Sequence, residues 1–240
     1  MKRIRYLRIS VACLLAIPLV NRGQAAFGQE AGCGPKCGEE RWAVKTLTDN
    51  DASKVNFSPI VKTVGDLAAV KAPNGNSETS RLDATEETTF KVQARLVGYK
   101  HETDGDFHIV IADLQNPSQT MIVEIPDPNC GGVCASPKLS DIKQARQDFA
   151  AQFPNAPPAP DFKVVQGNVV VEVTGVGFFD FAHGQTGLAQ NCVELHPVLA
   201  FDFPTPGPFE AKDDAQTQPP KHPEEWYSCI PRAPGATHTP

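Results

Sequence analysis

The sequence predicts a mainly β protein: a five-stranded, OB-like, partly open barrel with one helix after the third strand. Two observations support this fold class. Five segments between residues 88 and 203 alternate apolar and polar residues with the period of a strand, and a single helical pattern lies between the third and fourth of them. The resulting order, β-β-β-α-β-β, is that of an OB-fold.

The alternation is clearest in the first expected strand, where Phe90, Val92, Ala94 and Leu96 fall on one face. The five strands are expected over Phe90–Tyr99, Phe107–Asp113, Met121–Ile125, Val169–Phe179 and Val193–Phe203. In the fourth, Gly175 and Gly177 predict a sharp bend, as a barrel strand requires.

The helix is expected after the third strand. Ser136 is the predicted N-cap, and Pro137 is the predicted first helical residue. An apolar stripe from Leu139 to Phe153 follows, and Pro154 ends the helix.

The segments on either side of the barrel differ from it in composition. The expected organisation is a signal peptide over 1–26, an extended N-terminal arm over 27–87, the barrel over 88–203 and a Pro-rich disordered tail over 204–240. Trp42 is expected to dock the arm on the domain, while Trp226 and Cys229 are expected to hold part of the tail.

The first 26 residues have the pattern of a secretory signal. Four basic residues precede an apolar stretch from Ile9 to Val20 that is too short to span a bilayer, and cleavage is expected near Gly23 to Ala26. The mature protein is therefore expected to be secreted or periplasmic, without a transmembrane segment.

Removal of this signal changes the net charge. The signal contains five of the 22 Lys and Arg residues and no acidic residue, so 17 basic residues remain against 28 acidic ones, a net charge of −11. Such a surface repels phosphate backbones, which makes nucleic acid an unfavourable partner.

Six cysteines remain after the signal: Cys33, Cys37, Cys130, Cys134, Cys192 and Cys229. An even number in an oxidising compartment predicts disulfides. The expected pairs are Cys33 with Cys37, Cys130 with Cys134, and Cys192 with Cys229. The alternative is a zinc site made by the two C-x-x-x-C pairs.

A first polar cluster lies between the first two strands, in His101–His108. One interpretation is a tight turn in which aspartates cap backbone amides. The other is that Asp104, Asp106 and His108 bind a ligand, with Asp106 and His108 offering oxygen and imidazole ligands to a divalent cation.

A second polar cluster lies between Gly177 and Val198. Glu194 and His196 share one face of a strand, and Glu124 is expected beside them because the third and fifth strands of an OB-fold are neighbours. These three side chains are further candidate metal ligands; alternatively, they satisfy each other's hydrogen bonds within the fold. His183, Gln185 and Asn191 in the same segment are candidate ligand-binding residues.

Four stretches resemble a group of uncharacterised exported bacterial proteins. They are Trp42–Thr46, Asp104–Val110, Thr120–Pro126 and the long segment Gly177–Val198, which contains GFFDxxHGQxG and ELHPV. The resemblance implies one co-folded unit that includes the Trp42 segment, and it implies no particular activity. Cys192 departs from the pattern, where glycine is more typical.

Three functions remain open. The first is a non-catalytic module that binds a small molecule, glycan or protein. The second is a divalent-metal-dependent hydrolase, of nuclease or phosphodiesterase type, that uses Asp106, His108, Glu124, His183, Glu194 and His196. This hydrolase is weakened because the barrel segment offers few arginines beyond Arg95 and Arg146 to clamp a phosphate. The third is a structural protein that interacts with the cell envelope. G-x-S-x-G, P-loop and HExxH motifs are absent from the sequence.

Overall fold

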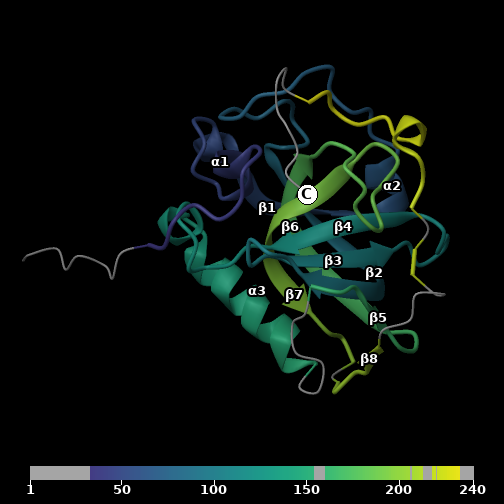
Figure 1. Ribbon diagram of the computed structural model, residues 1–240. Coiled ribbons are helices and arrows are strands. Elements are labelled where there is room, and N and C mark those ends of the chain that lie inside the picture. The colour runs from purple at the N-terminus through teal and green to yellow at the C-terminus, as the bar shows by residue number, and fades with distance from the viewer. Residues whose placement is uncertain (1–32, 154–159, 206, 213–217, 220, 233–240) are drawn as a thin grey trace, which may run out of the picture. The chain divides into compact units, whose positions relative to one another are not determined.

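The computed structural model describes residues 33–153, 160–205, 207–212, 218–219 and 221–232 (Figure 1). The expected signal peptide, residues 1–26, lies outside this range. No helix among the described residues is long and apolar enough to cross a membrane.

Five strands form a closed barrel, which confirms the predicted fold class (Figure 1). The strands are β2 (Thr88–His101), β3 (Phe107–Ala112), β4 (Thr120–Ile125), β6 (Val170–Phe179) and β7 (Val193–Asp202). They follow the order β3-β4-β7-β6-β2, and the ring closes because β2 also pairs with β3. Strands β4 and β7 run parallel, and the other pairs in the ring are antiparallel.

The alternation of β2 places its apolar residues inside the barrel. Val92, Ala94 and Leu96 are fully buried in the main core. Gly175 and Gly177 lie where the register between β6 and β7 shifts, as expected for a bend. A Cβ atom on Gly177 would collide with the carbonyl oxygen of Thr85, so the close approach at this bend requires glycine.

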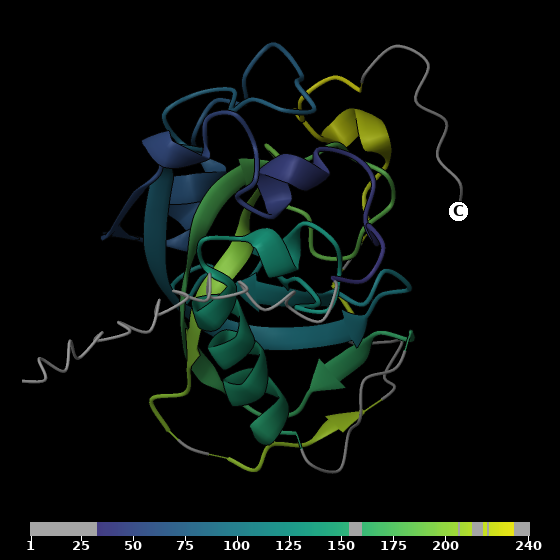
Figure 2. The same ribbon diagram turned by 90° about the vertical axis from the view of Figure 1, so that its left-hand side faces the viewer.

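Helix α3 (Leu139–Ala151) packs beside β7 through Ile142, Ala145 and Phe149. Figure 2 views the barrel from the side of this helix. The predicted N-cap was wrong: the helix begins after Lys138, which makes no side-chain cap. Ser136 instead ends the short helical turn η2 (Val133–Ala135), because its backbone N–H donates to the carbonyl of Val133.

The N-terminal segment is not simply an extended arm. It contains α1 (Trp42–Lys45), η1 (Ala52–Lys54), β1 (Asn56–Lys62) and α2 (Val64–Ala68). Strand β1 pairs in parallel with β2, and α2 begins with a reciprocal capping box between Thr63 and Asp66. The polar composition hid α1, η1 and β1, because their stability comes from packing against the barrel.

Arg41 fixes this N-terminal segment to the barrel. Its guanidinium is fully buried and donates to both carboxylate oxygens of Glu86, at 2.6 and 2.8 Å, and to the carbonyl of Phe179 at 2.8 Å. The guanidinium also lies over the Phe178 ring. These contacts hold α1 against the end of β6.

Two of the three predicted disulfide pairs were wrong. The structure joins Cys33 to Cys134 and Cys37 to Cys130, and only the Cys192–Cys229 pair agrees with the prediction. The N-terminal segment runs beside the loop after β4, where Gly131 N donates to Pro35 O at 2.8 Å. The cysteines therefore pair across these two segments, and no thiolate of the four remains for the alternative zinc site.

Part of the proline-rich tail is ordered. Strand β8 (Ala211–Lys212) pairs with β5 (Lys163–Val165), which in turn pairs with β2. Helical turn η3 (Glu224–Trp226) lies three residues before the disulfide at Cys229. Strand pairing holds β8, so the prediction of a disordered tail fails there, while η3 and Cys229 belong to the part of the tail that Trp226 and Cys229 were expected to hold.

Candidate functional site

A pocket of about 280 Å³ collects most of the polar residues that the sequence singled out. It lies between the α1 segment, the loop between β2 and β3, strand β4 and the segment after β6. Its wall includes Lys45, Glu102, Asp104, His108 and Glu124. The exposed fraction falls inward, from 27% for the Glu102 side chain to 12% for Glu124 and 1% for His108.

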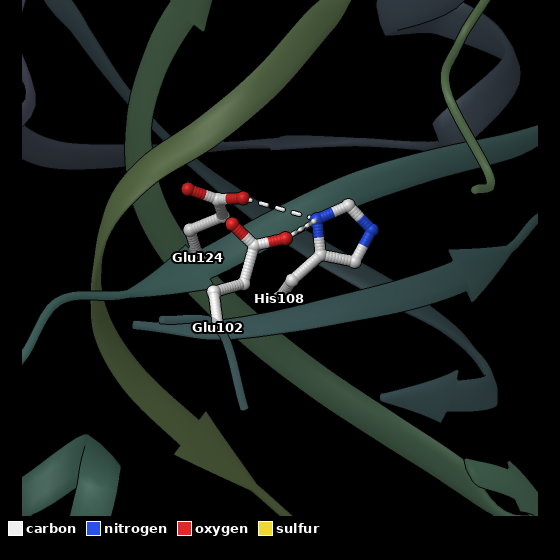
Figure 3. Close-up of side chains that lie close together, drawn as sticks. All are labelled: Glu102, His108 and Glu124. Atoms are coloured by element: carbon white, nitrogen blue, oxygen red, sulfur yellow. Dashed lines mark hydrogen bonds and ion pairs between the residues drawn. The ribbon is translucent and has the colours of Figure 1, made fainter. Parts of the chain in front are cut away.

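Strand register places the central pair of residues together. His108 of β3 lies directly opposite Glu124 of β4, and both side chains point to the outer face of the barrel. This outer face is covered by the N-terminal segment and by residues 180–192, so β3 is buried on both faces. Figure 3 shows Glu102, from the loop that follows β2, beside the same imidazole.

The two ring nitrogens of His108 have different roles. Nε2 lies 2.9 Å from the carbonyl oxygen of Thr186, which only accepts, so Nε2 carries a hydrogen. Nδ1 faces Glu124 Oε1 at 3.1 Å and Glu102 Oε1 at 3.6 Å (Figure 3). A lone pair on Nδ1 that faces two carboxylates is repelled by them, and a cation bound between the three atoms would remove this repulsion.

Glu124 also faces a second histidine. Its Oε2 lies 3.0 Å from Nδ1 of His196, while Nε2 of His196 lies 3.8 Å from Asp106 Oδ2. The 3.0 Å distance is short, but neither nitrogen of the buried His196 ring has a hydrogen bond with acceptable angles. We therefore treat the contact with Glu124 as electrostatic. Glu124 is thus shared by two imidazoles, one on each carboxylate oxygen.

Burial and mutual repulsion raise the pKa values of two carboxyl groups in the cluster, whereas nearby histidines and Lys45 lower that of a third. Burial, with added repulsion from Asp180 and Glu124, raises the pKa of Glu194 well above its usual value. Burial, with repulsion from Asp104 and Glu124, does the same for the pKa of Asp106. Burial alone would raise the pKa of Glu124, but contacts with the two histidines and the charge of Lys45 hold it well below its usual value. Of Asp106, Glu124 and Glu194, it is therefore Glu124 that stays ionised.

Sequence reasoning did not select Lys45 or its partner Asp180. Lys45 Nζ lies 3.6 Å from Asp180 Oδ2 and stands over the Phe178 ring. Burial opposes the charge of Lys45, but Asp180, Glu124 and Glu194 together raise its pKa. Burial likewise opposes ionisation of Asp180, and the lysine charge lowers its pKa to about 2. The signals in the sequence were the two stretches noted for the resemblance: Trp42–Thr46, which contains Lys45, and Gly177–Val198, which contains Asp180.

The remaining candidates occupy different places. His183 lines the pocket and lies 3.8 Å from Asp180. Gln185 also lines it, but its side chain accepts from His183 N and donates to Phe181 O, which shapes the loop. Asn191 lies outside this group, where it donates to the carbonyls of Leu67 and Val70. Glu194 is buried near the cluster, and its Oε2 makes no hydrogen bond.

The spacing of donor atoms suits a metal ion. In Glu102, His108 and Glu124, and again in Asp106, Glu124 and His196, one ligand atom from each residue lies within 4.8 Å of the others. Two ligands about 2.1 Å from a zinc ion in tetrahedral geometry are separated by roughly 3.4 Å. In the first group, Nδ1 of His108 lies 3.1 Å from Glu124 Oε1 and 3.6 Å from Glu102 Oε1, on either side of this value. Only the first group opens on the pocket with all three residues.

Comparisons with known proteins do not define a family. No protein-family model matches the chain, and no curated protein matches it. Among solved structures, a chain described as a "putative aspartyl-tRNA synthetase from Leishmania major Friedlin" aligns with a TM-score of 0.37 and 14% identity. The alignment covers 65% of this chain and 22% of that chain, and at this score it carries no argument about function.

Proposed function

We propose that the chain is an exported, non-catalytic module that binds a divalent transition-metal cation through Glu102, His108 and Glu124. The observation that carries the proposal is the orientation of His108. Its Nε2–H is held by the Thr186 carbonyl, which leaves Nδ1 directed at two carboxylates. Metal-ligating histidines are commonly fixed in this way, with the other ring nitrogen donating to a backbone carbonyl.

The type of ligand indicates the class of cation. One imidazole with two carboxylates suits Zn²⁺ or Mn²⁺ better than Ca²⁺, which prefers six to eight oxygen ligands. Glu124 Oε2 faces His196, so Oε1, the oxygen that would bind the cation, is oriented before the cation binds. Export is proposed from the signal-like residues 1–26 and is supported by the three disulfides.

Isothermal titration calorimetry tests the proposal on protein stripped with a chelator. We expect a single Zn²⁺ per chain, with a dissociation constant of roughly micromolar order or tighter. His108→Ala and Glu102→Gln should each weaken binding at least about tenfold. Glu172→Gln is the control, because Glu172 makes only a half-exposed pair with Lys91 outside the pocket. Equal binding by all four proteins, or no saturable binding by the parent, would contradict the site.

A metal-dependent hydrolase is the second candidate, and the pocket itself favours it. Three protein ligands leave coordination positions open, as in catalytic zinc sites, and the pocket beside them has room for a small substrate group. Lys45 is the cation that lines this pocket among the described residues. Cleavage of a chromogenic phosphodiester that requires added Zn²⁺ or Mn²⁺ and is lost in His108→Ala would favour this candidate over a non-catalytic module.

A further inference from the structure

A second cavity, of about 810 Å³, shares no lining residue with the pocket around His108. It lies where the outer face of β2 meets α2 and the C-terminal segment; Figure 1 shows η3, in yellow, beside α2. Arg95, Thr120, Gln190, His222 and Trp226 are among its lining residues. Its volume is within the range typical of ligand sites.

The outer wall of this cavity is fixed to the barrel. Cys229 forms a disulfide with Cys192, and Ser228 N donates to Gln190 O at 2.7 Å. Tyr227 packs against the small apolar cluster that includes Leu188. These contacts follow Trp226 immediately, so they hold the aromatic wall in place before a ligand binds. Such preorganisation lowers the entropic cost of binding.

Arg95 gives the cavity an uncompensated positive charge. Its neighbour Leu96 points into the core, so alternation along β2 directs Arg95 outward. Its Nε is buried without a hydrogen bond, and none of the ion pairs among described residues includes Arg95. Lys91, on the same face of the same strand, is instead paired with Glu172 at 2.7 Å. Arg95 can therefore pair with an anionic ligand, and a carboxylate matches the planar guanidinium, which can donate two hydrogen bonds to it.

Trp226 gives the same cavity a flat aromatic face. The indole stacks on His222 with ring centroids 4.1 Å apart, and 44% of Trp226 is exposed. The electron-rich face of an indole attracts C–H groups that carry partial positive charge, such as those on one face of a sugar ring. Hydroxyl and amide side chains of Ser118, Thr120 and Gln190 lie in the same lining and offer partners for sugar hydroxyls.

We infer that this cavity binds an acidic saccharide, with the carboxylate of a uronic acid on Arg95 and a sugar ring on Trp226. The proposal does not depend on the metal site. A neutral saccharide lacks the group that pairs with Arg95, while a small inorganic anion lacks the ring that packs on Trp226. Both contacts are needed for full affinity.

The test titrates the full mature protein, with a chelator present, against tetragalacturonate and against neutral maltotetraose. Trp226 is the reporter, because the only other tryptophan, Trp42, is 6% exposed. We expect a saturable change in fluorescence with tetragalacturonate, and at least about tenfold weaker binding of maltotetraose. Arg95→Gln should remove this preference. Lys91→Gln, the matched control on the same strand, should bind like the parent.

Calorimetry on the same variants and on Trp226→Ala provides a readout that does not depend on fluorescence, and thermal unfolding confirms that each variant folds. Trp226→Ala should weaken tetragalacturonate binding at least about tenfold. Three results would overturn the proposal: no binding of tetragalacturonate at about 1 mM, equal binding of the neutral saccharide, or equal losses in Arg95→Gln and Lys91→Gln.

Discussion

Replacing Arg41 by methionine should destabilise the protein by weakening the packing of the N-terminal segment against the barrel. All five N–H donors of the guanidinium are used: two bond Glu86, and the others bond the carbonyls of Ser77, Ser80 and Phe179. The variant leaves a fully buried carboxylate on Glu86 without its cation. Breaking a buried pair in this way costs about 3–5 kcal/mol.

The assay is urea-induced unfolding, with thermal unfolding as a second measurement. A domain of this size loses about 2–4 °C in melting temperature per kcal/mol, so Arg41→Met should melt about 6–20 °C lower. Adding Glu86→Gln removes the stranded charge and keeps one acceptor oxygen, for the backbone N–H of either Leu82 or Phe179, so the double variant should recover part of the loss. A cost below about 1 kcal/mol for Arg41→Met would refute the reasoning.

Two further predictions concern the buried charge and the disulfides. Burial raises the pKa of Glu194, so the folded protein keeps a proton that the unfolded chain loses as the pH rises above about 4.5, and the free energy of unfolding of the parent should fall over this range. In urea titrations, Glu194→Gln should become more stable relative to the parent between pH 5 and 8. A constant difference between the two proteins would contradict the pKa shift. Peptide mapping under non-reducing conditions should find Cys33 joined to Cys134 and Cys37 to Cys130, and recovery of the local pairs would contradict the structure. Opening the 37-residue loop with Cys192→Ser and Cys229→Ser should cost up to about 4 kcal/mol in urea unfolding, and an unchanged stability would show that the bond contributes nothing.

The barrel was predictable because local alternation determines which face of each strand is buried. Val92, Ala94 and Leu96 show this in β2. Strand pairing then followed from the order of elements, and it placed Glu124 and His196 together as expected. The helix start was misplaced because Ser136 and Pro137 resemble an N-cap and a first turn, while the backbone uses Ser136 to end η2.

Contacts between distant segments could not be read from local pattern. Arg41 and Lys45 lie in a polar stretch with no strong periodicity. Only when this segment packs on β6 does Arg41 become fully buried and the Lys45 side chain largely covered, at 16% exposure. The crossed disulfides depend on two loops lying side by side, which sequence spacing does not encode. Glu102 lay inside the first polar cluster but was not selected, since its relation to His108 arises from the hairpin geometry.

Long-range ¹H–¹⁵N NMR of the His108 ring tests the proposed metal site most directly. The Thr186 carbonyl should keep the hydrogen on Nε2 throughout. On addition of Zn²⁺ to chelator-stripped protein, Nδ1 should take the chemical shift of a metal-bound nitrogen, because it faces Glu102 and Glu124. Nδ1 and Nε2 shifts that stay unchanged at saturating Zn²⁺ would contradict the account.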